Sequence, residues 1–263
     1  MLQTRLKTAA ILLPAVLAII LFAPPIAFTV FIAIVTVWGL YESGAMVDAT
    51  KRPWIWISLL GIWSVRRLAL GGEVWWPWLM IVAASALYAL LTVGLEGAEE
   101  GRFVGWPLTY PFWVAVLFPY FALLRNGQNG IAVLILMLLF VVASDSGAYF
   151  TGRSLGRVKL LPKVSPNKTV EGAIGGLAAT VMAGLLLRSS LVPQLSRWQI
   201  VVMGIAAATL AQIGDLVNSA FKRIAGVKDS GWIFPGHGGL LDRTCSLVFP
   251  VTFAYYYLRL VKV

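Results

Sequence analysis

The sequence predicts an all-α, polytopic integral membrane protein with about nine transmembrane helices. Hydrophobic residues make up 59% of the 263 residues and charged residues only 12%, unlike the balance of a soluble domain. Apolar segments of about 20 residues, the length that crosses a bilayer as a helix, recur from end to end. Eleven tryptophans and frequent glycine and proline are also typical of membrane helices.

The first predicted span, residues 8–23, combines features of a signal peptide and of a membrane helix. Arg5 and Lys7 precede the apolar run, as they would in a secretory signal. However, Pro24 and Pro25 follow it without a small-residue cleavage site, and further apolar segments come after. We therefore interpret this segment as a retained transmembrane helix.

Eight further apolar segments follow in order, and two of them are irregular. The third span is interrupted by Arg66 and Arg67. The fifth contains Pro111 and Pro119, which predict a kink because proline cannot donate a helical hydrogen bond. The predicted spans are residues 8–23, 26–45, 54–70, 75–95, 107–124, 130–150, 172–187, 199–221 and 241–260.

The distribution of charge predicts the orientation and the kind of partner. The formal net charge is +10, and the cations lie in short loops between apolar runs. With the N-terminus inside, inward-facing cations outnumber outward-facing ones about two to one, as the positive-inside rule expects. Anionic lipid headgroups and phosphates are therefore favoured as partners over nucleic acid. The single cysteine, Cys245, excludes an internal disulfide.

The chain divides into two regions by the kind of residue that each carries. Residues 1–129 form N-terminal transmembrane helices, and residues 130–263 form a C-terminal transmembrane region that carries the chemistry. Two basic loops of the second region, 151–171 and 222–241, follow even-numbered spans. Both are therefore predicted to face the cytoplasm.

A polar stripe runs along the predicted eighth helix. Gln212, Asp215, Ser219 and Lys222 recur at intervals of three and four residues, so they share one helical face. Such a stripe at membrane depth must be buried in protein or face a water-filled cavity. A substrate cavity is one interpretation, and a polar seam between packed helices is the other.

The segment after this helix joins glycines to ionisable groups. Gly236, Gly238 and Gly239 permit a close backbone approach to a ligand and precede the ninth helix, whose N-terminal amides favour an anion. Asp242 lies in the first turn of that helix. Together with Asp215 it offers the carboxylates that Mg²⁺ takes beside substrate phosphates. A re-entrant turn, in which the glycines serve geometry alone, is the alternative.

His237, the only histidine, lies within the same segment. A catalytic acid/base role and a structural hydrogen-bonding role both stay open for it. Lys228, Asp229 and Arg243 flank the histidine and add charge to the predicted phosphate and metal site.

A second polar region begins at the end of the sixth helix. Asp145, Tyr149 and Arg153 recur every four residues, and a basic loop containing Lys168 and Glu171 follows. An ordinary positive-inside loop would explain the outer cations but not Asp145. Ser165 or Asn167 is expected to cap the seventh helix.

These segments resemble the bacterial-type phosphatidate cytidylyltransferases, the CDP-diacylglycerol synthases. The upstream segments D-S-G-A-Y-F-T-G-R and S-P-N-K-T-V-E-G are similar to that family, and the resemblance covers about residues 140–250. The family signature reads here Ser219, Lys222-Arg223, Lys228-Asp229, Pro235-Gly236-His237-Gly238-Gly239 and Asp242-Arg243.

The resemblance implies that CTP and phosphatidate react to CDP-diacylglycerol and pyrophosphate at the cytoplasmic face of the inner membrane. It places Mg²⁺ on Asp215 and Asp242, and it leaves open a second cation such as K⁺ and a homodimer. The implied catalytic residues are Asp215, Asp242, Lys222 and His237. The implied substrate-binding residues are Asp145, Lys168, Glu171, Ser219, Arg223, Lys228, Asp229, Gly238, Gly239 and Arg243.

One position departs from the family pattern, and two other functions remain as alternatives. The family signature ends Asp-Arg-x-Asp, whereas Cys245 stands here at the last position, which predicts a slower enzyme or a shifted substrate. A CTP-dependent lipid (polyprenol) kinase would release CDP instead of pyrophosphate. A transporter of anionic lipid would need no nucleotide. It would, however, have interrupted helices in both halves of the chain, whereas here the interruptions cluster in the C-terminal half.

Overall fold

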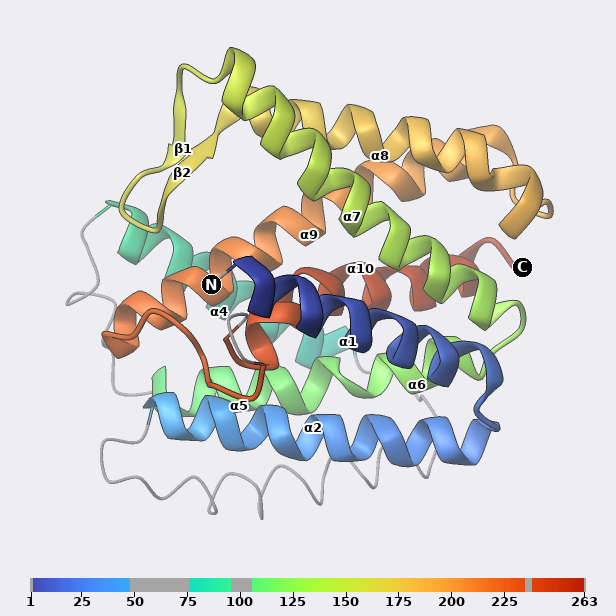
Figure 1. The fold of residues 1–263 in the computed structure, drawn as a ribbon, viewed down its shortest axis with the longest axis horizontal. Helices are drawn as coiled ribbons and strands as arrows, with labels where there is room; N and C mark the ends of the chain where they lie inside the picture. The colour runs from blue at the N-terminus through green and yellow to red at the C-terminus, as the bar shows by residue number, and fades with distance from the viewer. Residues whose placement is uncertain (1, 48–75, 96–105, 235–237, 263) are drawn as a thin grey trace. The chain divides into compact units, whose positions relative to one another are not determined.

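The fold is mainly helical, as expected, with one small hairpin. A computed structural model describes residues 2–47, 76–95, 106–234 and 238–262 (Figure 1). Its elements are α1 (Leu2–Phe22), α2 (Pro25–Val47), α4 (Trp76–Leu95), α5 (Trp106–Leu117), α6 (Pro119–Arg125), α7 (Gly130–Leu155), β1 (Lys159–Leu161), β2 (Ser165–Thr169), α8 (Val170–Leu191), α9 (Arg197–Ala225) and α10 (Leu241–Leu260).

Contacts group the chain into two compact units. The first unit contains residues 1–123 and 220–244, and the second contains residues 124–219 and 245–263. Helices α9 and α10 each contribute one end to the first unit and the remainder to the second. The expected division between residues 129 and 130 separates plain apolar helices from the region with the predicted site residues. It is not a division by contacts, and it stays a prediction.

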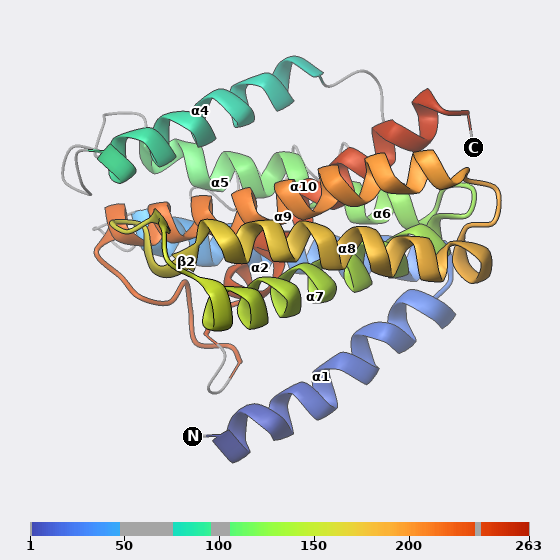
Figure 2. The ribbon, with the colours of Figure 1, turned by 90° about the horizontal axis from the view of Figure 1, so that it is seen from above.

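In the first unit, α5 packs against both α2 (Figure 1) and α4 (Figure 2). Aromatic residues dominate this core, since the Tyr110 ring stacks on Phe221 at 4.6 Å and Trp113 meets the same ring edge-on at 5.4 Å. The Trp113 indole also donates to Ser85 Oγ on α4 at 2.8 Å. This packing holds the last turns of α9, where Phe221 lies, beside α5.

In the second unit, α7 and α8 pack along a line of small residues. A Cβ at Gly147 would lie 2.5 Å from the Ala179 Cβ and 2.8 Å from the Gly175 carbonyl oxygen. Thr180 Oγ1 crosses the same interface and donates to the Phe140 carbonyl oxygen at 3.3 Å. Small residues let the two backbones approach closely, which is how helices associate in membranes.

The hairpin between α7 and α8 corrects the all-α expectation in one place. Strands β1 and β2 pair antiparallel, with Lys159 opposite Thr169 and Leu161 opposite Ser165 (Figure 1). Helix α8 begins directly after β2, and its cap is Thr169, whose hydroxyl accepts from Gly172 N at 3.1 Å. The expected caps, Ser165 and Asn167, are wrong because α8 begins only at Val170, so the residue directly before it, Thr169, is the cap.

Four of the described helices are long and apolar enough to cross a membrane. They are Pro25–Met46, Gly130–Leu155, Val170–Leu191 and Arg197–Ala225. By length and composition these helices indicate a multi-pass membrane protein. The expected total of nine spans is not confirmed, and the expected third span, 54–70, lies outside the described residues.

The expected fifth span is two helices rather than one kinked helix. Helix α5 ends at Leu117 and α6 begins at Pro119, so the chain breaks at Phe118. A residue before proline is disfavoured in the helical region, which explains the position of the break. Pro111, the other expected kink, lies within the continuous helix α5.

Candidate active site

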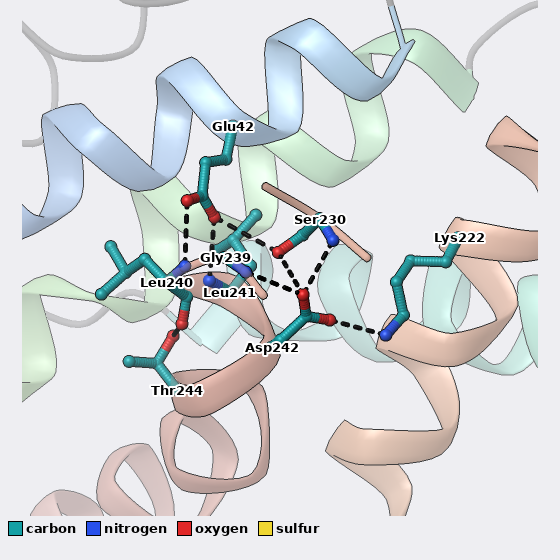
Figure 3. A network of polar contacts seen from close by, with 8 residues as sticks. All are labelled: Glu42, Lys222, Ser230, Gly239, Leu240, Leu241, Asp242 and Thr244. Atoms are coloured by element: carbon teal, nitrogen blue, oxygen red, sulfur yellow. Dashed lines mark hydrogen bonds and ion pairs between the residues drawn. The ribbon is translucent and has the colours of Figure 1, made fainter. Parts of the chain in front are cut away.

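The first group of functional side chains surrounds Asp242 in the first turn of α10. Asp242 Oδ1 accepts from Lys222 Nζ at 2.6 Å, and only 4% of the Asp242 side chain and 16% of the Lys222 side chain are exposed. Asp242 Oδ2 accepts from Ser230 N at 2.8 Å, Ser230 Oγ at 3.0 Å and Gly239 N at 3.0 Å. The carboxylate is therefore held on both oxygens (Figure 3). The Asp242 cluster comprises Glu42, Lys222, Ser230, Gly239 and Asp242.

The end of α9 delivers Lys222 to this cluster through a defined stop. Gly226 has a φ of +72°. Val227 N bonds the Lys222 carbonyl oxygen at 2.9 Å, and Gly226 N bonds the Arg223 carbonyl oxygen at 3.0 Å. This pattern is the Schellman motif, in which glycine takes the left-handed conformation just beyond a helix. The sequence R-I-A-G-V therefore ends α9 at Ala225, so that Lys222 and Arg223 lie in its last turn.

Glycines after this stop leave room for the carboxylates. Gly238 has a φ of +82°, and a Cβ there would lie 2.6 Å from Asp242 Oδ2. A Cβ at Gly239 would contact Ser230 Oγ and would lie 2.5 Å from Glu42 Oε2. These glycines let the backbone approach carboxylates of the protein itself, whereas the sequence predicted that they approach a ligand.

Glu42 is a member of the cluster that the sequence analysis missed. It lies on α2 with 3% exposure and accepts from Leu240 N at 2.9 Å and Leu241 N at 3.0 Å. Ser230 Oγ at 3.3 Å and the Trp38 indole at 3.0 Å complete its set of donors. An acidic residue inside an apolar span was the available signal, because buried charge at membrane depth normally has a function.

The expectation that the N-terminal amides of α10 bind a substrate anion is therefore corrected. Gly239 N is bonded to Asp242, and the amides of Leu240 and Leu241 are bonded to Glu42. A helix N-terminus favours negative charge, and here two protein carboxylates supply it.

The second group of functional side chains lies in the second unit. Lys168 Nζ on β2 lies 2.5 Å from Asp215 Oδ2 on α9, and 28% and 42% of the two side chains are exposed. We call these residues the Asp215 pair. One turn earlier on α9, Gln212 Nε2 donates to the Ala173 carbonyl oxygen of α8 at 3.1 Å. The polar stripe thus begins as a helix–helix seam at Gln212 and continues as an ion pair at Asp215.

Two other predicted residues of this unit differ in their surroundings. Both carboxylate oxygens of Glu171 accept from Val158 N, at 3.2 and 3.3 Å, so this side chain holds the start of the hairpin against α8. Asp145 is exposed on α7. Further along that helix, Arg153 Nη1 donates to Tyr149 Oη at 3.0 Å.

The remaining predicted residues surround the two groups. Arg223, Lys228, Asp229 and Arg243 are exposed, and Ser219 is half-buried on α9. His237 lies outside the described residues, together with Pro235 and Gly236. The catalytic and binding roles assigned to all these residues stay predictions.

The metal assignment also stays a prediction. Asp215 and Asp242 carry the hard oxygen atoms that Mg²⁺ prefers, but each carboxylate is paired with a lysine, and they belong to different units. Within the part of the chain that the structure describes, no three His, Cys, Asp or Glu side chains gather as a metal-binding group. The carboxylate oxygens are of the kind that Mg²⁺ binds, and whether they hold one ion stays a prediction.

Cys245, where the family signature has a carboxylate, is buried at a helix contact. Its exposure is 9%. A Cβ at Gly214 of α9 would contact the Cys245 carbonyl oxygen and would lie 3.0 Å from Phe249 Cδ2. Helix α10 therefore meets α9 at the turn that contains Asp215.

Comparisons with known proteins agree with the signature. Residues 3–261 match the model of the cytidylyltransferase family. The phosphatidate cytidylyltransferase of Brucella suis is 35% identical over 268 residues, which cover 97% of this chain and 92% of the relative. The Haemophilus influenzae protein of the same name is 31% identical over 98% of both chains. The Bacillus subtilis protein is 40% identical over 69% of this chain and 68% of its own length.

Proposed function

The chain belongs to the cytidylyltransferase family, and we propose that it is a phosphatidate cytidylyltransferase. It transfers the cytidylyl group of CTP to phosphatidate and yields CDP-diacylglycerol and pyrophosphate. The relatives from Brucella and Haemophilus carry this name and match almost the whole chain. The observation that carries the proposal is the Lys222–Asp242 ion pair. It lies in the family signature, and it fixes the half-buried Lys222 ammonium at a carboxylate whose other oxygen is held by Ser230 and Gly239.

The reaction needs positioning and charge neutralisation rather than a covalent enzyme intermediate. A phosphatidate oxygen attacks the α-phosphorus of CTP, the bond from that phosphorus to the bridging oxygen breaks, and pyrophosphate leaves. Fixed cations stabilise the charge that develops on the phosphate oxygens. Lys222 is the most firmly fixed candidate, and Arg223, Lys228 and Arg243 are exposed cations near it in sequence.

The Asp215 pair contributes a second lysine to the same chemistry. Asp215 and Lys222 lie seven residues apart on the continuous helix α9, so they share one of its faces. Lys168 and Lys222 each neutralise a carboxylate before substrate binds, and each can turn from that carboxylate to a substrate phosphate. Asp145, Glu171, Ser219, Asp229, Gly238, Gly239 and His237 are proposed to line or shape the substrate site.

The proposal includes Mg²⁺ held by Asp215 and Asp242, with a second cation such as K⁺ left open. Bound there, the metal would neutralise charge on the nucleotide phosphates and on the departing pyrophosphate. Asp215 and Asp242 would orient the ion. Without it, their carboxylates stay paired with Lys168 and Lys222.

We also propose nine spans and a cytoplasmic site in the inner membrane. Helices α7, α8 and α9 are consecutive candidate spans, so the segments 156–169 and 226–240 emerge on the same side. The first segment carries four cations and no carboxylate, and Lys222 and Arg223 at the end of α9 directly precede the second, which favours the cytoplasm. The acyl chains of phosphatidate would then stay in the bilayer while its headgroup meets the cations. A homodimer is part of the proposal, and light scattering of the purified protein tests it.

Cysteine labelling tests the side of the membrane. Ser154, at the end of α7 just before the first segment, and Trp232, in the second segment, are exposed, so each is changed to Cys in a Cys245→Ser background. A membrane-impermeant maleimide should label both positions in inside-out vesicles and neither in intact cells. Labelling of either position from outside intact cells would contradict the topology.

Product analysis tests the activity itself. Purified protein in detergent is incubated with phosphatidate, Mg²⁺ and each labelled nucleoside triphosphate in turn, and lipid and water-soluble products are resolved. CTP should give CDP-diacylglycerol and an equal amount of pyrophosphate. Release of CDP would indicate a lipid kinase instead. The absence of nucleotide turnover, with lipid movement across vesicles, would indicate a transporter.

A further inference from the structure

Glu42 stands apart from the residues of the family signature. It is the one acidic residue in the sequence of the apolar helix α2, and it binds segments that lie 188 to 199 residues further along the chain. With 3% exposure its carboxylate is sealed from solvent. Four protein donors engage this carboxylate, so its effect on the reaction passes through the groups that it binds.

We propose that Glu42 is a positioning residue for cytidylyl transfer. It fixes the first turn of α10 and the segment Gly226–Phe234, and thereby fixes the orientation of Asp242 and its ion pair with Lys222. The inference rests on the proposed function, because it assigns Glu42 a part in that reaction.

The hydrogen bonds around the two carboxylates form a single arrangement. Glu42 Oε1 accepts from Leu240 N and the Trp38 indole, and Glu42 Oε2 accepts from Leu241 N and Ser230 Oγ. Asp242 takes the next amide, that of Gly239. Three consecutive amides at the start of α10 are thus shared between two carboxylates. The positive end of the helix and the Lys222 ammonium offset their mutual repulsion.

Ser230 links Glu42 to Asp242 directly. Its hydroxyl lies 3.3 Å from Glu42 Oε2 and 3.0 Å from Asp242 Oδ2, and its amide donates to the same Asp242 oxygen at 2.8 Å. Ser230 itself is buried. If Glu42 is removed, Ser230 and the start of α10 lose their common anchor. Asp242 Oδ2 then loses its fixed donors, and Oδ1 is no longer directed at Lys222.

The backbone around Glu42 is shaped to admit it. A Cβ at Gly231 would lie 2.6 Å from Glu42 Oε1, and a Cβ at Gly239 would lie 2.5 Å from Glu42 Oε2. Both distances are far below ordinary contact between a carbon and an oxygen atom. The two glycines therefore provide space for this carboxylate, independently of the hydrogen bonds that it accepts.

The test compares Glu42→Gln with Thr36→Val in the full-length protein. Glutamine keeps the size of the side chain, but its NH₂ group faces an amide or hydroxyl donor and cannot accept a hydrogen bond from it. Thr36 is a matched control, because it is a buried polar residue of the same helix whose hydroxyl bonds within α2 to the Ile32 carbonyl oxygen. The measurements are kcat, the KM values for CTP and phosphatidate, and hydrogen–deuterium exchange of peptides across the chain.

The proposal expects a fall in kcat of about 10- to 100-fold for Glu42→Gln with both KM values within about threefold, because misplacement of a catalytic group slows the chemical step. Amide exchange should accelerate in peptides covering 226–234 and 238–245 and stay unchanged in α7 and α8. Thr36→Val should leave kcat and exchange unchanged.

Two results would overturn the proposal. One is a kcat of Glu42→Gln within about twofold of the parent value, and the other is a fall accompanied by faster exchange throughout the chain. If the parent protein makes no CDP-diacylglycerol, the proposed function fails, and the exchange measurement still decides whether Glu42 holds these segments.

Discussion

The Asp242 cluster and the Asp215 pair both contain a lysine–aspartate ion pair, yet their surroundings differ. The nitrogen–oxygen distances are nearly equal, 2.6 Å for Lys222–Asp242 and 2.5 Å for Lys168–Asp215. The Asp242 side chain is 4% exposed, whereas the Asp215 side chain is 42% exposed. Equal distances therefore do not mean equal consequences, because solvent screens the second ion pair more than the first.

Burial and anchoring predict different functions for the two pairs. The backbone and Glu42 support the Asp242 cluster, as a preorganised element of the proposed site requires. The Asp215 pair is open to solvent, and exposed pairs of this kind contribute little to stability. Its lysine is therefore the easier of the two to transfer to an incoming phosphate.

The largest effect is expected for Asp242→Asn. Turnover should fall below detection, and the protein should lose roughly 2 kcal/mol of unfolding free energy, because the half-buried Lys222 is left without its counter-charge. Activity assays and thermal unfolding in detergent measure the two losses. The double variant Asp242→Asn with Lys222→Met should recover stability without activity. Unchanged stability in the single variant would show that the pair is not buried in the working protein.

A smaller total effect is expected for Asp215→Asn. Turnover should again be lost if this carboxylate orients Mg²⁺, but the unfolding free energy should change by less than about 1 kcal/mol, since the pair with Lys168 is exposed. The same two assays measure the outcome. Near-native turnover at saturating Mg²⁺ would remove Asp215 from the proposed site. A stability loss as large as that of Asp242→Asn would abolish the contrast between the pairs.

The smallest effect is expected for Cys245→Asp. Residues i and i+3 are neighbours on a helix, so an aspartate there restores a carboxylate beside Asp242 on α10. The Mg²⁺ concentration for half-maximal rate should fall about two- to fivefold, because the added negative charge favours the cation. Without Mg²⁺, the melting temperature should decrease, since position 245 is buried. Cys245→Asn is the control for size. An unchanged Mg²⁺ titration would show that this position has only a packing role.

Much of the protein could be predicted from sequence because the relevant signals are local. Apolar length predicts helices, and the spacing of Asp215 and Lys222 predicts that they share a face of α9. The signature between Ser219 and Arg243 predicts the family, which the comparisons confirm. Each of these signals is contained in a few turns of helix or in a contiguous motif.

The tertiary structure decided which groups meet. The family resemblance assigned both Lys168 and Asp215 to the site, but only the packing of β2 beside α9 pairs them directly. An acidic residue in an apolar helix requires a partner, yet nothing in the sequence of α2 identifies the amides of Leu240 and Leu241 as that partner. Periodicity specifies the face on which a side chain lies, while its partner depends on which distant element packs there. For that reason the amides expected to bind substrate are bonded to the protein's own Glu42.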